Sequence, residues 1–392
     1  MPETLALAEK SAELQQLVKR VARARRVVVV TGAGISVNSG IPDFRSASGV
    51  FRQIQAAHGH VVGKGRDLFD ASVVFRSGAA AAVFYEWMTQ LRRQCAAARP
   101  GAAHAFIRQL ADRGVLQRSY TQNIDGLERK AGLRVWDPYQ KPGSAGHVPW
   151  QQAHSVPLHG TMDHLTCQLC ASAVPFAALP GGAAAGDACA ECLQRSQARE
   201  ACGRRALATG KLRPAVVLYE ELHPHGEDIA RIISHDARSR ADVVLVFGTT
   251  LKVPGCRQLV RRLAAGPRTT TVVVNNEPVC GRAWDGVVDY QVVGCVDEWC
   301  ARVQRAWNAQ SKITQWATKR TRGAPAAKEN APEPTSRKRR VSDSDSEPEP
   351  TSRKRRAPDN NSSLEPARRS ARIATRGGPA DYQQRQPLSI CT

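Results

Sequence analysis

The clearest chemical signal in the sequence is a set of four cysteines arranged as two CxxC pairs. Cys167 and Cys170 form the first pair, and Cys189 and Cys192 form the second after an interval of eighteen residues. Two such pairs can supply four thiolates to a tetrahedral Zn²⁺, and a site closed by four protein ligands has no open position for substrate. We therefore predict a structural zinc site in an inserted module at about residues 161–210, with Cys202 as a less favoured alternative ligand.

A glycine-rich loop follows a run of valines at residues 27–30. Gly32, Ala33, Gly34 and Ser36 succeed that run. Glycines allow the backbone to approach a pyrophosphate, and a following helix N-terminus would favour its negative charge. Val37 stands at the third glycine position of GxGxxG, and no acidic residue lies about twenty residues further on. The loop thus predicts nucleotide binding and argues against a hydride-transferring dehydrogenase.

Two polar segments could complete a site beside this loop. Asp43, Phe44 and Arg45 lie in the short segment GIPDFRS, although Asp43 could equally cap a turn while Phe44 fills the core. The segment TQNIDG places Asn123 and Asp125 after a predicted strand at residues 116–120, where ligands of α/β sheets bind. An ordinary Asx turn would explain the same two residues.

His159 is a candidate general base. It stands between an apolar residue and a glycine, directly before the cysteine module, and an imidazole with a reference pKa of about 6.5 can accept a proton near neutrality. The chain has ten histidines, so an ordinary surface or core histidine is the alternative. Further polar strand ends are predicted at residues 248–253 and 275–278.

The helices and strands predicted to hold these residues alternate as in an α/β fold. Residues 9–26 have apolar positions at helical spacing, and continuous apolar runs at 27–30, 216–218, 243–247 and 272–274 indicate strands of a parallel sheet. Helical patterns such as HAFIRQLADRG lie between some of them. Residues 137–157 are rich in Pro, Gly and Gln and are predicted to form an exposed loop.

Composition separates the C-terminal part from the rest. The net charge of +21 favours partners such as nucleic acid or chromatin. Residues 311–392 are polar, carry PEPTSRKRR twice around an acidic serine run, and are predicted to be a disordered basic tail that suits nuclear import or phosphate contact. A solubilising tail is the alternative.

No apolar stretch is long enough for a membrane span, and paired cysteines favour a reducing compartment, so we expect a soluble intracellular protein without a membrane partner.

Taken in order, several motifs resemble those of the sirtuin family over roughly residues 20–300. They are GAGIS, GIPDFRS, TQNIDGLE, LHG, the paired CxxC units, LRPAVVLYEE, GTTLKV and NNEP. The segments VPLHG and LRPAVVLYEE, with the basic tail, resemble the fungal nuclear branch that deacetylates histone H3. The resemblance implies an N-terminal helix (1–26) and a catalytic domain (27–310). That domain combines a Rossmann-like parallel-sheet large domain with a small domain, made of the zinc module and a helical insertion at about 46–100.

The resemblance also implies the site and the reaction. NAD and an acetyl-lysine peptide are expected in the cleft between the two domains, with His159 as general base and Asn123 beside the reacting ribose. The residues that it assigns to NAD are Gly32, Ala33, Gly34, Ser36, Asp43, Phe44, Arg45, Gln122, Asn123, Asp125, Gly248, Thr249, Thr250, Asn275, Glu277 and Val296.

The implied activity is NAD-dependent deacetylation of histone lysines in the nucleus, yielding nicotinamide, O-acetyl-ADP-ribose and free lysine, with a role in chromatin silencing or genome maintenance. Acetylated histone peptides, chromatin or nucleic acid, and the nuclear import machinery are the implied partners. Where many sirtuins have Val-x-Phe-Gly-Glu, this chain has Tyr219 and Glu220, which leaves the acyl preference open. A zinc-containing chromatin-binding scaffold and a mono-ADP-ribosyltransferase remain as alternatives.

Overall fold

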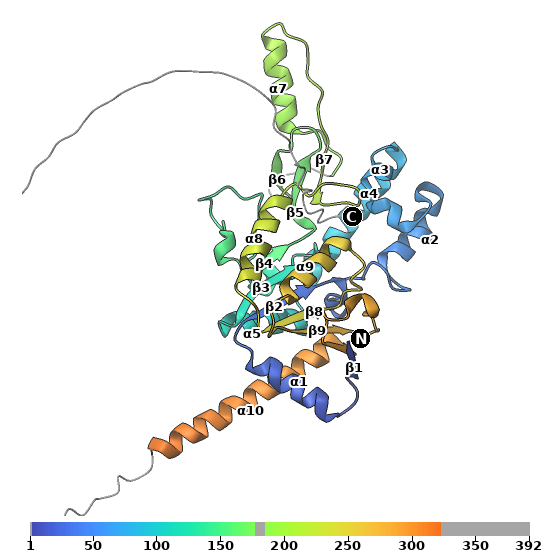
Figure 1. Ribbon diagram of the computed structural model, residues 1–392. Coiled ribbons are helices and arrows are strands. Elements are labelled where there is room, and N and C mark those ends of the chain that lie inside the picture. The colour runs from blue at the N-terminus through green and yellow to red at the C-terminus, as the bar shows by residue number, and fades with distance from the viewer. Residues whose placement is uncertain (1, 177–184, 323–392) are drawn as a thin grey trace, which may run out of the picture. The chain divides into compact units, whose positions relative to one another are not determined.

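A seven-stranded sheet in which every strand pairs in parallel forms the centre of the main compact unit (Figure 1). The computed structural model describes residues 2–176 and 185–322, with side chains up to residue 310. The strand order is β1-β10-β9-β8-β2-β3-β4. The strands are β1 (Glu3–Ala6), β2 (Val27–Thr31), β3 (Leu116–Thr121), β4 (Ser155–Pro157), β8 (Val243–Phe247), β9 (Thr270–Asn275) and β10 (Tyr290–Val293). The predicted Rossmann-like sheet is confirmed.

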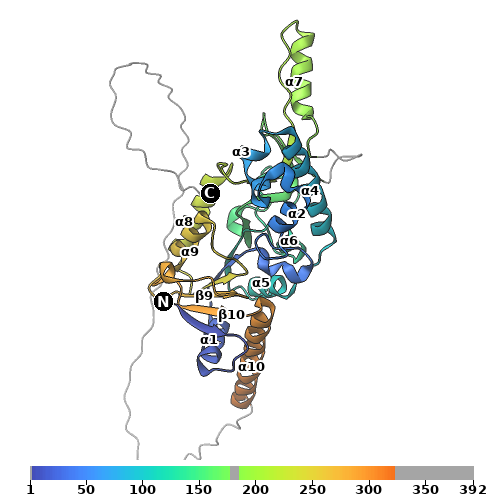
Figure 2. The same cartoon turned by 90° about the vertical axis from the view of Figure 1, so that its right-hand side faces the viewer.

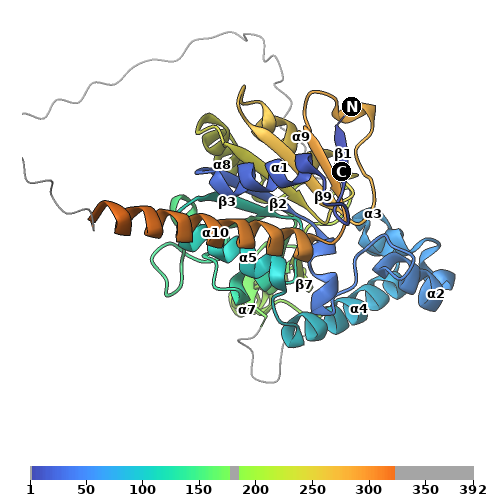
Figure 3. The same cartoon turned by 90° about the horizontal axis from the view of Figure 1, so that it is seen from below.

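Both faces of the sheet are covered by helices, which explains its continuous valine runs. Successive side chains of a strand point to opposite faces, so Val27 and Val29 join one core while Val28 and Val30 join the other. Helices α1 (Ala12–Arg23), α5 (Ala102–Asp112) and α10 (Val296–Arg322) contribute to the first core. Helices α8 (Gly226–Arg238) and α9 (Pro254–Ala264) contribute to the second, on the other side of the sheet from α5 and α10 (Figure 3).

The strand order reverses at β2, and this reversal determines where a ligand can bind. β2 pairs with β3 on one side and with β8 on the other. The strands that follow β3 and those that follow β8 are therefore added on opposite sides of β2. Parallel α/β sheets bind ligands outside the carboxyl ends of the strands at such a point. The loops after β2, β3, β8 and β9 are therefore the ones that can form a site.

The segment between β2 and β3 forms a group of helices that lie together in Figure 2. This helical layer has its own core. It consists of α2 (Val50–Val62), a 3₁₀ helix (Gly65–Phe69), α3 (Ala71–Val74) and α4 (Gly78–Ala97), within the range predicted for the helical insertion. Buried Ile54, Phe84 and Met88 pack in this core together with Ile124 and Leu218. The insertion is thereby joined to the loop after β3 and to the segment after β7.

The cysteine module is a small three-stranded antiparallel sheet with one helix. Its strand order is β6-β5-β7, formed by β6 (Ala173–Pro175), β5 (Gly160–Cys167) and β7 (Leu212–Val216), and α7 (Ala190–Ala201) follows the second cysteine pair. Among the residues of the module that the structure describes, Leu165 and Leu212 are the buried members of its core besides the cysteines. So few apolar side chains leave room for a metal to contribute to its stability.

Four predictions about the elements need correction. The N-terminal segment is more than a helix, because β1 precedes α1 and pairs with β10 at the sheet edge. The predicted strand at 216–218 is replaced by β7, which belongs to the small antiparallel sheet. Residues 137–157 are not one exposed loop, since Asp137 and Ala153 are buried and β4 pairs with β3. Helix α10 continues to Arg322, beyond the predicted start of the tail at 311.

The basic repeats and the acidic serines of the predicted tail lie outside the described residues. Among the helices that the structure describes, none has the length and hydropathy of a membrane span.

Candidate functional site: a cavity at the strand ends and a cysteine cluster

A cavity of about 450 Å³ opens at the carboxyl ends of β2, β3, β8 and β9, next to the insertion and the segment after β7. It brings together motifs that are more than 200 residues apart in the sequence. Of the residues expected at the site, those lining it are Gly32, Ala33, Gly34, Asp43, Phe44, Arg45, Gln122, Asn123, His159, Gly248, Thr249, Thr250, Asn275 and Glu277.

Three glycines bring the loops after β2 and β8 into backbone contact. The Gly34 N–H donates to the Gly248 carbonyl at 2.9 Å. A Cβ at Gly32 or Gly34 would lie 2.7 Å from Gly248 atoms or Thr249 Cβ, and Gly248 itself has φ +58°. No other residue type fits these positions without moving the loops. The loop does not lead into an α-helix whose N-terminus could favour a pyrophosphate, because its residues form two short 3₁₀ turns, Ala33–Ile35 and Val37–Ser39.

The loop after β3 is held to the glycine loop by side-chain hydrogen bonds. Asn123 Nδ2 donates to the Gly32 carbonyl and to Ser36 Oγ, both at 3.2 Å, and Ser36 Oγ donates to Asp125 Oδ2 at 2.7 Å. Asp125 also accepts from the Leu127 N–H at 2.9 Å. The Asx-turn alternative is thus realised at Asp125, whereas Asn123 lies at the cavity wall.

Gln122 connects three strand ends. Its backbone N–H donates to the Thr31 carbonyl at 2.9 Å, and its side-chain Nε2 donates to the same carbonyl at 3.2 Å and to Thr249 Oγ1 at 3.0 Å. Thr31, Gln122 and Thr249 come from the ends of β2, β3 and β8. Gln122 therefore fixes the spacing of the loops around the cavity.

His159 lines the cavity and is oriented by the backbone of the loop after β3. Its Nδ1 lies 2.9 Å from the Gln122 carbonyl oxygen. Because a carbonyl can only accept, Nδ1 carries the proton and the lone pair of the neutral ring is on Nε2. Burial lowers the pKa of His159, and the Gln122 carbonyl opposes this shift. A neutral imidazole held in this tautomer can act as a general base.

The segment GIPDFRS forms another part of the cavity wall. Asp43 Oδ1 accepts from the backbone N–H groups of Arg45 and Ser46, both at 2.7 Å, so the turn-capping alternative also holds. The Phe44 ring packs against Phe69 with ring centroids 5.4 Å apart. Arg45 Nη2 donates to the Tyr219 hydroxyl at 3.0 Å, which joins this wall to the segment after β7.

Ser36, Asp125 and Val296 do not line the cavity. Ser36 and Asp125 lie behind Asn123 and hold it in place. Val296 begins α10 and is buried in the first core with Trp299.

Sequence reasoning missed Phe51, Phe69 and Ile124, which do line the cavity. They stand at apolar positions that look like ordinary core residues, so no sequence signal set them apart.

Glu128 is a further buried acid near the site that the sequence did not single out. It is 2% exposed, and burial, reinforced by the negative charge of Asp125, raises its pKa to about 8. Burial and the neighbouring Asp125 thus favour the protonated form of the Glu128 carboxyl.

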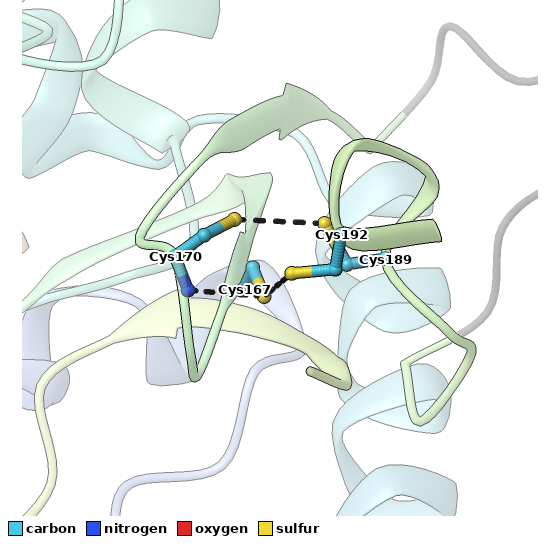
Figure 4. A group of neighbouring side chains, drawn as sticks. All are labelled: Cys167, Cys170, Cys189 and Cys192. Atoms are coloured by element: carbon cyan, nitrogen blue, oxygen red, sulfur yellow. Dashed lines mark hydrogen bonds between the residues drawn. The ribbon is translucent and has the colours of Figure 1, made fainter. Parts of the chain in front are cut away.

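The four cysteines of the two CxxC pairs meet in one cluster (Figure 4). All four Sγ atoms lie within 4.8 Å of one another. The Cys167–Cys192 and Cys170–Cys189 Sγ distances are both 3.7 Å. Tetrahedral zinc with Zn–S bonds of about 2.3 Å would separate the sulfurs by ~3.8 Å, so the cluster fits one Zn²⁺. Cys202 is exposed and lies outside the cluster.

Comparison with known proteins places these motifs in a family. The model of the Sir2 family matches residues 32–255. The chain is 34% identical to the NAD-dependent histone deacetylase HST3 of Candida albicans, over 74% of this chain and 61% of that protein. It is 37% identical to the NAD-dependent protein deacetylase hst4 of Schizosaccharomyces pombe, over 67% of this chain and 62% of that protein. The chain thus spans about three fifths of these curated relatives.

A solved structure has the same fold. The crystal structure of a Sir2 homolog–NAD complex aligns with a TM-score of 0.57 and 21% identity, covering 79% of this chain and 97% of that one.

Proposed function

Because the chain belongs to the Sir2 family, we propose that it is an NAD-dependent protein-lysine deacetylase. The observation that carries the proposal is His159, which faces the cavity with its Nδ1 bound to the Gln122 carbonyl and its Nε2 free to accept a proton. The similar proteins named above as NAD-dependent deacetylases support the same activity.

NAD is the proposed co-substrate, bound across the contact between the two glycine loops. Gly32, Ala33 and Gly34 present backbone to the cavity, and Thr249 and Thr250 add hydroxyls from the loop after β8. Asn275, the last residue of β9, and Glu277, which follows the strand, are proposed to hold the adenosine half. Ser36 and Asp125 are proposed to act on the nucleotide through Asn123, whereas Val296, buried in the first core, is no longer proposed as a contact.

The proposed reaction proceeds by transfer of the acyl group to ADP-ribose. The acetyl oxygen bonds to the ribose carbon as the bond to nicotinamide breaks. Asn123 is proposed to hold the ribose, and His159 takes a proton from a ribose hydroxyl, whose oxygen then attacks the imidate carbon. Addition of water releases lysine and O-acetyl-ADP-ribose. The proton acceptor must be neutral for this step, as burial of His159 favours.

The proposed zinc is structural. The four thiolates would satisfy its coordination, leaving no position for a substrate. It would tie β5 to the start of α7, and β5 follows directly from His159.

The proposed substrates are acetylated lysines of histones, with histone H3 as the expected target. The HST3 proteins of Candida albicans and Saccharomyces cerevisiae are named NAD-dependent histone deacetylases, which supports histone substrates. A nuclear location is part of the same proposal. Binding of chromatin or nucleic acid by the basic tail, its recognition by the import machinery, and a role in silencing or genome maintenance belong to the same proposal.

The test combines an acetylated H3 peptide with the full chain, with and without NAD, and measures free lysine peptide and O-acetyl-ADP-ribose. We expect product only with NAD and at least a ~100-fold loss in His159→Ala, in line with the effect of removing a general base. The matched control is His60→Ala, because His60 is exposed on α2. Folded wild type that forms neither product would refute the proposal. ADP-ribosylated protein without deacetylation would favour the transferase alternative.

A further inference from the structure

A basic groove lies at the amino ends of the strands, on the opposite side from the cavity at their carboxyl ends. It is an open hollow of about 500 Å³ between α1 and the residues that lead into β2, β8 and β9. Its charged lining residues are Lys19, Arg20, Arg23, Arg25, Asp242 and Arg268. These residues stand at the amino ends of the strands, whereas the cavity stands at their carboxyl ends.

The groove has an excess of unpaired positive charge. Asp242 is its one carboxylate among the described lining residues, and it is already engaged. It accepts from the backbone N–H groups of Arg25 and Arg26 at 3.0 and 2.9 Å and pairs with the Arg26 guanidinium at 3.2 Å. Within the described part of the chain, no carboxylate pairs with Lys19, Arg20, Arg23, Arg268 or the Arg25 side chain. Like charges gathered in this way repel one another unless a polyanion is bound.

Arg240 extends the same surface. It follows the end of α8 with φ +47°, a left-handed position that glycine normally occupies after a helix. Arg240 is exposed, and Arg26 reaches the adjacent Ser239 carbonyl at 2.9 Å. Helix-end geometry alone would favour glycine here, so a cation at this position calls for another explanation.

We propose that this groove binds the phosphate backbone of double-stranded DNA. Four of its five unpaired cations are arginines, whose planar guanidinium groups match phosphate oxygens. Protein interfaces typically have an apolar centre, but none of the large exposed apolar residues of the described chain lines this groove. They are Val37, Leu169, Leu193, Leu207 and Leu222.

The position of the groove allows DNA and a protein substrate to bind at the same time. A strand of five residues such as β2 spans about 16 Å, so the cavity and the groove are separated by the length of the strands. A lysine substrate can therefore enter the cavity while the opposite edge rests on a duplex. This inference stands on the groove and does not depend on the proposed deacetylation.

The test measures binding of the full chain to a fluorescein-labelled duplex of about 20 base pairs by anisotropy, between ~50 and ~200 mM KCl. The groove variant is Arg20→Gln/Arg23→Gln/Arg268→Gln. The control is Arg52→Gln/Arg76→Gln/Arg93→Gln, which removes the same charge from exposed, unpaired arginines of the helical insertion.

Each lost phosphate contact lowers the slope of log affinity against log salt by about 0.9. We therefore expect the groove variant to lose ~2.7 in slope and to bind about tenfold or more weakly at low salt, with an unchanged melting temperature. The control should match the wild type.

Equal affinity and slope in the groove variant and the wild type would overturn the inference and assign binding to the tail. Equal losses of affinity and slope in the groove variant and the control variant would also overturn the inference, because net charge alone would then explain the binding. A groove variant that loses affinity for polyglutamate but not for DNA would assign the groove to an acidic protein instead.

Discussion

Asp236 of α8 offers a direct test of how the fold is held beneath the site. Its carboxylate is 2% exposed and accepts from Arg118 Nε at 2.8 Å, from Arg118 Nη2 at 3.2 Å and from the Tyr120 hydroxyl at 2.7 Å. Arg118 and Tyr120 belong to β3, which ends at the loop that carries Gln122 and Asn123. Arg118 also donates to the Trp150 carbonyl at 2.7 Å and to that of Ala153.

Replacing Asp236 by alanine would leave the Arg118 guanidinium buried without a counter-charge. Breaking a buried pair in this way costs roughly 3–5 kcal/mol. Asp228 is a matched control on the same helix, because it pairs with Arg231 at 3.0 Å but both side chains are largely exposed. Its replacement by alanine should cost about 0–1 kcal/mol. Both pairs join an aspartate to an arginine, so the difference arises from burial and from the additional hydrogen bonds that Asp236 accepts.

The measurement is thermal unfolding of the full chain, followed by tryptophan fluorescence. At about 2–4 °C per kcal/mol for a domain of this size, Asp236→Ala should lower the midpoint by roughly 10 °C and Asp228→Ala by ~4 °C or less. The double variant Arg118→Met/Asp236→Leu removes both charges and should recover part of the loss. Equal midpoints for Asp236→Ala and Asp228→Ala would refute this account of the network.

Three further predictions concern the site. Chelation of zinc should unfold the cysteine module and abolish activity, since that module has little apolar core. Metal analysis should find one zinc per chain in the wild type and in Cys202→Ser, and none in Cys189→Ser. Gly248→Ala should raise the KM for NAD at least tenfold in steady-state assays, because a Cβ there would lie 2.7 Å from the Ile35 nitrogen at φ +58°; Gly281→Ala, with open space around it, should have no effect. Burial lowers the pKa of His159 below the usual histidine value of ~6.5, so the base stays neutral until the pH falls below that value. The acidic limb of the pH profile of kcat/KM should therefore have its midpoint below ~6.5. A midpoint above ~6.5 would contradict this assignment.

The sequence predicted the central strands well because of where they lie. β2 and β8 are buried on both faces, and such strands must be apolar throughout. β1 and β4 have four and three residues, too few for a periodic pattern to emerge, and β1 is at an edge with Glu3 and Thr4 exposed. The run at 216–218 signalled burial correctly, but an apolar run carries no information about the direction of the partner strand.

The site was predicted unevenly for a related reason. Short motifs identified the loops, since each loop needs particular residues at fixed spacing, as the cysteine pairs do. The aromatic wall of the cavity could not be predicted, because Phe51 and Phe69 become neighbours of the glycine loop only through packing of the insertion. The same holds for the contact that makes Gly248 necessary, which depends on a loop more than 200 residues away.

The departure at Tyr219 and Glu220 can be understood from the contacts around it. Glu220 takes φ +62°, the left-handed conformation for which glycine is suited, so the turn survives without glycine at some cost in strain. Glu221 compensates, because it accepts two hydrogen bonds from Arg213, at 2.6 and 2.8 Å, and one from the Leu218 N–H at 3.0 Å. These bonds hold the turn at Glu220, and of the two altered side chains it is Tyr219 that lines the cavity, with its hydroxyl on Arg45. We therefore expect any altered acyl preference to originate from this hydroxyl.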